Sequence, residues 1–264
     1  MRFTRLVTCG DSFTEGMSDD IINGQYRGWA DRIADVMAKE VSEFTYANLA
    51  VRGKLVHQVV ADQIPVALSL IIGKETLVTF HAGANDVLRP NYKSEIVLPL
   101  YAKAVREIAS TGATVLLFTV LERTGAKGRT AELWASRFGK FNENIRAVGA
   151  EVGAIIADAN EAGLLSDRRF LAKDRLHLNA LGHERVAQGL LEKLGLPFDV
   201  NWRNSLPAQP PSHWLKKVAS DSQWFFTFLI PWMWRRLRGK SSGDGRFPKH
   251  LAPITWPTMS TDLH

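Results

Sequence analysis

Five short apolar runs alternate with amphipathic segments along the first 200 residues, and this alternation is the strongest constraint on the fold. The runs are Phe3–Cys9, Phe44–Leu49, Thr76–Ala82, Ala113–Val120 and Ala154–Asp158. Most of them are rich in β-branched residues, are nearly continuously apolar, and end at Gly, Asn or Asp. This pattern is typical of strands that are buried on both faces of a parallel sheet.

The segments between the runs carry apolar residues at helical spacing. In "WADRIADVMA", Trp29, Ile33 and Val36 fall on one side of a helix. The same pattern occurs in "IVLPLYAKAVREIA", "LWASRFGKFNENIRAVG" and "ALGHERVAQGLLEKLG". Strands and helices in strict alternation predict right-handed crossovers. The predicted fold is therefore an α/β three-layer αβα sandwich around a parallel sheet of about five strands.

Residues 201–264 differ in composition from the first 200. They hold nine Lys and Arg against three Asp and Glu, an excess of six that accounts for the whole formal net charge of +6. They also hold six of the eight tryptophans. Because residues 1–200 are neutral, the net charge does not indicate a nucleic-acid-binding protein. We expect one domain over residues 1–200 and a Trp-rich, basic, helical or irregular extension over residues 201–264.

The extension allows three interpretations. The sequence predicts a helix from His213 to about Arg238 within residues 213–240, followed by an irregular segment over residues 241–264. The helix packs its aromatic residues onto the first domain, or it binds a membrane surface as a peripheral amphipathic segment. Alternatively, it forms a homodimer contact or caps a site on the domain. Pro231 interrupts the segment, which is too short to span a bilayer.

The cellular compartment is predicted from the cysteine content and the N-terminus. Cys9 is the single cysteine, so the chain forms no internal disulfide, and we expect this residue to pack at a strand end. The N-terminal residues lack the apolar core of a secretory signal. We therefore predict a cytoplasmic protein, with membrane-peripheral binding through the extension as the alternative.

Polar residues follow the predicted strands at the points where ligands bind in open α/β sheets. Ser12 comes just after the first strand, Gly53 after the second, and Asn85 after the third. Asp174 and His177 stand near the end of the domain. These residues together would supply every group that acyl transfer needs.

Each residue type has a chemical reason in such a site. A serine hydroxyl is a weak nucleophile, and His177 can take its proton and later return it to a leaving group. Asp174 can bind the other ring nitrogen and fix the tautomer. The backbone N–H groups of Ser12 and Gly53 and the side-chain amide of Asn85 are candidate donors to an oxyanion.

The four blocks, in this order, resemble those of the SGNH hydrolases, the GDSL-type esterase and lipase family. The shared blocks are Gly-Asp-Ser, a glycine after the second strand, Gly-x-Asn-Asp and Asp-x-x-His, and they span about residues 7–195. The resemblance implies a flavodoxin-like fold, a lipase-like serine hydrolase, and no metal or organic cofactor. It implies Ser12 as nucleophile, Gly53 and Asn85 in the oxyanion hole, and Asp174 and His177 as the rest of a catalytic triad.

Taken singly, each block has an ordinary structural explanation. Gly-Asp-Ser can be a turn and a helix cap, and Gly-Ala-Asn-Asp is common turn chemistry. We interpret Asp11 and Asp86 as supporting residues that order their loops. His57 and His81 are expected to be packed or surface histidines. His177 and His183 lack a third ligand at a recognisable spacing, so no metal site is predicted.

The predicted function is hydrolysis of carboxylic esters through an acyl-enzyme on Ser12. The expected substrate is a small-molecule acyl ester, with short acyl chains as the default. Thioesters, acetylated sugars and lysophospholipids stay open, and the extension slightly favours lipid-like substrates. The alternatives are an acyltransferase that uses the same site, and a non-catalytic scaffold whose extension binds a membrane or a partner.

Overall fold

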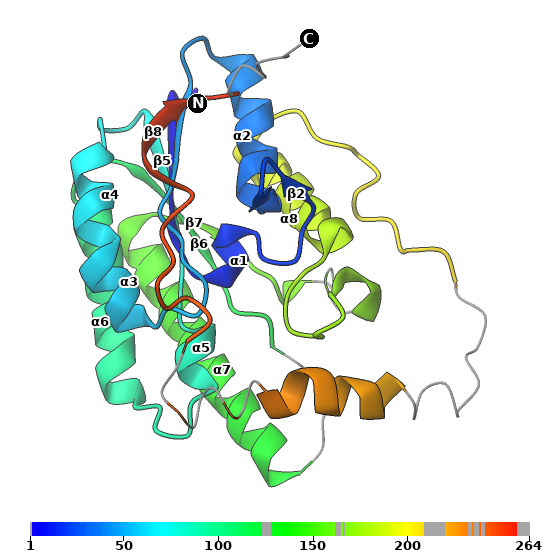
Figure 1. Ribbon diagram of the computed structural model, residues 1–264. Helices are drawn as coiled ribbons and strands as arrows, with labels where there is room; N and C mark the ends of the chain where they lie inside the picture. The colour runs from blue at the N-terminus through cyan, green and yellow to red at the C-terminus, as the bar shows by residue number, and fades with distance from the viewer. Residues whose placement is uncertain are drawn as a thin grey trace.

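The computed structural model describes residues 2–122, 128–161, 165, 167–208, 220–231, 234, 238 and 241–257. A six-stranded sheet in the order β7-β6-β5-β1-β4-β8 forms its centre, with helices on both faces (Figure 1). The strands are β1 Arg5–Gly10, β4 Thr45–Asn48, β5 Thr76–His81, β6 Thr114–Phe118, β7 Ile155–Ala157 and β8 His250–Thr255. The first five are mutually parallel and overlap the five predicted runs, so the predicted α/β sandwich is confirmed.

Alternate residues of each strand enter two separate cores. Leu6 of β1 packs with the helices α2 (Gly28–Glu40) and α8 (Ala180–Leu194), whereas its neighbour Val7 packs into the core on the opposite face. That second face is covered by α3 (Val56–Asp62), α4 (Ile64–Leu70), α6 (Ser94–Ala109) and α7 (Arg129–Val152). Burial on both faces explains why the strands lack the polar alternation of a half-exposed sheet.

Four of these helices match the predicted amphipathic segments, but α3 and α4 were not expected. Pro65 lies in the first turn of α4, where the missing N–H costs nothing because that position has no partner within the helix. Because each of these two helices has only seven residues, neither shows a long helical repeat of apolar residues in the sequence. Two further short helices, α1 (Ser12–Glu15) and α5 (Ala84–Val87), begin directly after β1 and β5. A small hairpin joins β2 (Ile21–Ile22) to β3 (Gln25–Tyr26).

The sixth strand comes from the C-terminal extension. The prediction of irregular structure over residues 241–264 is wrong for β8, which pairs antiparallel with β4. Pro253 lies inside this strand, and a proline is tolerated there because β8 is at the edge of the sheet. Proline is unfavourable in strands, so the sequence does not predict β8. Residues 258–264 lie outside the described residues.

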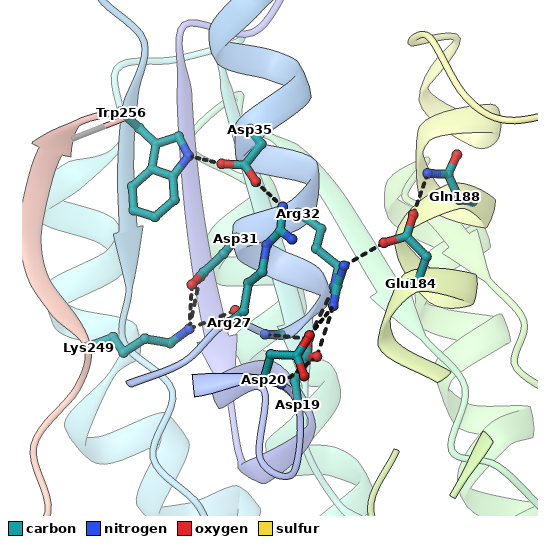
Figure 2. Close-up of polar contacts among 11 residues, drawn as sticks. Asp19, Asp20, Arg27, Asp31, Arg32, Asp35, Glu184, Gln188, Lys249 and Trp256 are labelled. Carbon is teal, nitrogen blue, oxygen red and sulfur yellow. Dashed lines mark hydrogen bonds and ion pairs between the residues drawn. The ribbon is translucent and has the colours of Figure 1, made fainter. Parts of the chain in front are cut away.

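Polar contacts fix β8 to α2 (Figure 2). The Nζ atom of Lys249 lies 2.9 Å from both carboxylate oxygens of Asp31, and both side chains are at least nine-tenths buried. The indole nitrogen of Trp256 donates to Asp35 at 2.9 Å. The end of the extension is thus an integral part of the sheet, although the division of the chain at residue 200 stays a prediction.

Within residues 213–240, the described part is residues 220–231 together with Trp234 and Arg238. Residues 220–231 are helical and include a π-helical stretch, η3 (Phe225–Leu229). This helix contacts the domain through Trp224, whose indole nitrogen donates to the carbonyl oxygen of Asp174. In the part of the chain that the structure describes, no helix is long and apolar enough to cross a bilayer. Membrane binding and dimer formation stay predictions.

Candidate active site

The serine of the first block opens a helix at the carboxyl end of the central strand. Ser12 is the first residue of α1, and Asp11 caps this helix by accepting a hydrogen bond from the backbone nitrogen of Phe13 at 3.1 Å. The capping interpretation of this block is therefore correct for Asp11. The N–H of a first helical residue has no partner within its helix, which is why such groups can bind anions.

Ser12, His177 and Asp174 form a continuous hydrogen-bonded line. Nε2 of His177 lies 3.1 Å from Oγ of Ser12, and Nδ1 lies 2.6 Å from Oδ2 of Asp174. The other carboxylate oxygen of Asp174 accepts the backbone N–H groups of Leu176 and His177. Burial raises the pKa of Asp174, but hydrogen bonds from His177 and the backbone outweigh it and leave the pKa below its ordinary value. The carboxylate is thus charged at neutral pH and orients the imidazole.

Asn85 lies beside this line, and its amide group is held from two sides. Its Nδ2 atom donates to Oδ2 of Asp11 at 3.1 Å and to the carbonyl oxygen of Lys54 at 3.2 Å. Asp11 therefore connects the start of α1 to α5, the short helix after β5. An amide held in this way is already oriented, so it can donate to a developing negative charge when it exchanges its bond to Asp11 or to Lys54.

Asp86 orders the neighbouring loops. Its Oδ2 atom accepts the backbone N–H of Val56, the first residue of α3, at 3.0 Å. Burial raises the pKa of Asp86 to about 7, and the nearby carboxylate of Asp11 adds to this effect. The side chain does not line the cavity beside Ser12. These contacts agree with the expected loop-ordering role.

Gly53 has a left-handed backbone with φ of +75°, which favours glycine. A Cβ atom at this position would lie 2.2 Å from Oγ of Ser241 in the C-terminal extension. The carbonyl oxygen of Gly53 accepts a hydrogen bond from the same hydroxyl at 3.2 Å. Gly53 does not line the cavity that Ser12, Asn85 and His177 share. Its assignment to an oxyanion hole stays a prediction.

An ion pair that the sequence did not reveal connects the loop of Gly53 to α1. The guanidinium of Arg52 pairs with the carboxylate of Glu15, and the backbone nitrogen of Arg52 donates to the same carboxylate. Both side chains are largely buried. The two residues lie in different blocks, and no spacing rule connects them.

The remaining candidate residues take ordinary positions. His57 is exposed on α3, whereas His81 is buried, packs against Phe13 and lines the cavity. His183 is buried with Nε2 3.2 Å from the carbonyl oxygen of Met17, and burial lowers its pKa to about 4. Burial raises the pKa of Cys9 to about 12, so this thiol is a packed core residue. The described residues contain no cluster of three side chains that could hold a metal ion.

A cavity of about 660 Å³ opens beside Ser12 and extends between the ends of β6 and β7 and helix α8. Most of its lining is apolar and includes Phe118, Ala159 and Leu190. Trp134 and Leu176 lie at the exposed mouth. Such a space fits an apolar ligand whose polar end reaches Ser12.

The chain resembles known hydrolases in sequence profile and in fold. Residues 8–185 match the profile of the GDSL-like Lipase/Acylhydrolase family. A search of curated protein sequences finds no match.

Solved structures share the fold at low sequence identity. Axe2, an acetylxylan esterase from Geobacillus stearothermophilus, is 18% identical with a TM-score of 0.58, over 74% of this chain and 96% of that one. A lipolytic protein of the G-D-S-L family from Veillonella parvula is 22% identical with a TM-score of 0.55, over 71% and 96% of the two chains. The psychrotrophic esterase EstA from Pseudoalteromonas is 14% identical with a TM-score of 0.54, over 73% and 97%.

Proposed function

The chain belongs to the GDSL-like lipase and acylhydrolase family, and from this premise we propose that it hydrolyses carboxylic esters through an acyl-enzyme on Ser12. The observation that carries the proposal is the line of hydrogen bonds from Ser12 through His177 to Asp174 at the mouth of a largely apolar cavity. Related proteins support it. Catalytic mutants of Axe2 carry alanine in place of a serine or a histidine, and one structure of EstA is inhibited by monoethylphosphonate.

In the proposed mechanism, Nε2 of His177 takes the proton from Oγ of Ser12 as this oxygen attacks the ester carbonyl. The imidazolium that forms is stabilised by the carboxylate of Asp174. Protonation of the leaving alkoxide by His177 breaks the ester bond and leaves the acyl group on Ser12. A water molecule, deprotonated by the same imidazole, then attacks the acyl carbonyl. The bond between the acyl carbon and Oγ of Ser12 breaks, the imidazolium returns the proton to Oγ, and the carboxylic acid is released.

The oxyanion needs donors that already point toward it. Ser12 and Asn85 both line the cavity. The backbone N–H of Ser12, the amide of Asn85 and the N–H of Gly53 are the donor set that the family resemblance implies. Asn85 would exchange its hydrogen bond with Asp11 or Lys54 for one with the oxyanion. Loss of one such donor costs about 10²–10³ in rate.

The cavity supports an acyl group with a substantial apolar part. Its lining is mostly aliphatic and aromatic, so a lipid-like or medium-length acyl chain is the proposed substrate class. An acyltransferase is the alternative, because the same acyl-enzyme can pass its acyl group to an alcohol instead of water. Product analysis with a competing alcohol distinguishes these two outcomes.

The direct test uses a fluorophosphonate probe and a series of p-nitrophenyl esters of increasing chain length. We expect a covalent adduct at Ser12 and loss of both labelling and hydrolysis in Ser12→Ala. The matched control is Ser69→Ala, which removes an exposed hydroxyl that donates to the carbonyl oxygen of Val66 within α4. Folded protein that lacks an adduct at Ser12 would falsify the esterase proposal and favour a non-catalytic scaffold.

A further inference from the structure

The C-terminal extension is attached to the α/β domain at both of its ends. At its start, Trp202 is buried against α8, where a Cβ atom on Gly189 would lie 2.8 Å from the indole ring. At its end, Lys249 and β8 are fixed beside β4, at the other edge of the sheet from β7.

Between the two attachments, the extension contacts the turn that carries Asp174. Nε1 of Trp224 donates to the carbonyl oxygen of Asp174 at 2.7 Å. The guanidinium of the next residue, Arg175, lies 5.1 Å from the centre of the Trp224 ring. The same guanidinium pairs with Asp221 at 2.6 Å and donates to the hydroxyl of Ser220 at 3.0 Å. One helix thus holds two consecutive residues of the turn.

The conformation of this turn decides where the carboxylate of Asp174 points. Oδ1 is used by the turn itself, because it accepts the N–H groups of Leu176 and His177. Oδ2 is the carboxylate oxygen that reaches the imidazole of His177. Arg175 has φ of +57°, in the left-handed region that residues other than glycine seldom adopt. A turn of this kind persists when its surroundings restrain it.

The extension also contacts the loop on the other side of the nucleophile. The hydroxyl of Ser241 donates to the carbonyl oxygen of Gly53. Gly243 packs so closely on Arg52 that a Cβ atom there would lie 1.9 Å from the Arg52 carbonyl oxygen. The same extension therefore touches two loops that flank Ser12, and its helix is the orange element in Figure 1.

We infer that Trp224 is a positioning residue for the Asp174–His177 pair, and that Asp221 supports it by holding Arg175. The inference rests on the proposed function, because the direction of the Asp174 carboxylate affects the rate only if His177 transfers protons. Without the indole N–H, the turn has more conformations available, and a smaller fraction of molecules has Oδ2 aligned with Nδ1. The extension then affects catalysis by positioning the carboxylate of Asp174, without contact between the extension and the ester.

The test compares Trp224→Phe and Asp221→Asn with the wild-type protein. Phenylalanine keeps an aromatic ring beside Arg175 and removes only the N–H donor, whereas Asp221 is exposed and its replacement leaves the core intact. With p-nitrophenyl acetate, we expect kcat to fall about 10-fold in Trp224→Phe, with KM within about twofold of wild type, since small misplacements of catalytic groups cost rate. We also expect the acid limb of the pH–rate profile to move to lower pH, because the imidazolium is less stabilised.

Trp256→Phe is the matched control. It removes the same kind of indole hydrogen bond, to Asp35, at the edge of the sheet away from Ser12. At a temperature where all variants are folded, this control is expected to keep the wild-type kcat and pH profile. Equal losses of kcat in Trp224→Phe and Trp256→Phe would show a general effect on stability and overturn the inference.

Fluorophosphonate labelling separates failure of the inference from failure of the proposed function. If wild-type protein is not labelled at Ser12, the proposed function fails and the positioning role fails with it. If wild-type protein is labelled, and Trp224→Phe and Asp221→Asn are labelled at the same rate with unchanged pH profiles, only the positioning role is overturned. Slower labelling of both variants, with normal labelling of Trp256→Phe, supports it.

Discussion

The Nδ1 atom of His177 lies 2.6 Å from Oδ2 of Asp174, only three residues earlier in the chain. In the proposed mechanism, a carboxylate at this position fixes the imidazole tautomer whose Nε2 accepts a proton from Ser12. The contact is local in sequence, whereas the contact to Ser12 joins the two ends of the domain. The orientation of the His177 imidazole therefore depends on a residue in its own turn, and its contact with Ser12 depends on the fold.

Asp174→Asn is expected to lower kcat by about 10³–10⁴-fold with little change in KM, because an amide favours the wrong imidazole tautomer. The matched control is Asp199→Asn, which alters an exposed carboxylate that accepts a backbone N–H two residues later, as Asp174 does. Steady-state kinetics on p-nitrophenyl acetate measures both. A loss below about 10-fold in Asp174→Asn would contradict the assigned role of the carboxylate.

Asp86 predicts a pH-dependent stability. Its pKa is about 7 in the folded protein against an ordinary value of 3.8, mainly because of burial. The folded state therefore binds this proton more tightly than the unfolded chain. The resulting stabilisation is fully present below about pH 4 and is lost as the pH rises through about 7, with an upper limit of about 4 kcal/mol.

Asp86→Asn removes this titration while keeping an oxygen that can accept the N–H of Val56. We expect the free energy of unfolding of wild type to fall relative to this variant between pH 4 and pH 8 in urea titrations. Parallel pH profiles for the two proteins would show that Asp86 is charged in the folded state throughout this range.

The sequence predicted those parts of the molecule that depend on local patterns or on the ends of strands. The five parallel strands follow from continuous apolar runs, and Ser12 lies where β1 ends and α1 begins. The chain gave no such signal for β8, whose proline lowers its strand propensity and whose attachment depends on Lys249 meeting Asp31. The two residues of such a long-range ion pair are not related by any sequence periodicity or fixed spacing, so the sequence alone does not reveal the pair.

The same reason explains the site residues that sequence reasoning missed. Glu15 and Arg52 stand 37 positions apart, and Trp224 stands 50 positions from Asp174. The tryptophan content of the extension was visible, but its contact with the turn depends on the path of the chain after residue 208. The family resemblance ends before that segment and carries no information about it.

The cavity predicts that chain-length preference can be changed without changing the chemistry. Ala159 lies at the end of β7 and lines the cavity, so Ala159→Phe fills part of the space. We expect kcat/KM to fall at least about 10-fold for p-nitrophenyl octanoate and by less than about twofold for the acetate, since each excluded methylene forfeits favourable burial. Ala61→Phe, on the exposed side of α3, is the control. Equal effects of Ala159→Phe on both esters would place the acyl chain elsewhere.

Lys249→Met tests whether β8 is held by the buried ion pair in Figure 2. The substitution leaves the Asp31 carboxylate buried without its cation, and its other partner, the hydroxyl of Tyr46, is neutral. Removing one member of a buried pair costs about 3–5 kcal/mol of unfolding free energy. Lys54→Met, which breaks the more exposed pair with Asp62, is the control and is expected to cost at most about 1 kcal/mol.

Two further measurements make this prediction specific to charge. The loss in Lys249→Met should shrink as the pH falls, because Asp31 then takes up a proton and is no longer an unpaired buried charge. Asp31→Asn combined with Lys249→Met should recover part of the stability, because the amide needs no cation. Hydrogen exchange of the β4 amides that face β8 should rise in the single variant, since pairing of these two strands depends on the pair. A single variant with wild-type stability and protected β4 amides would mean that packing of Trp256 alone holds the strand.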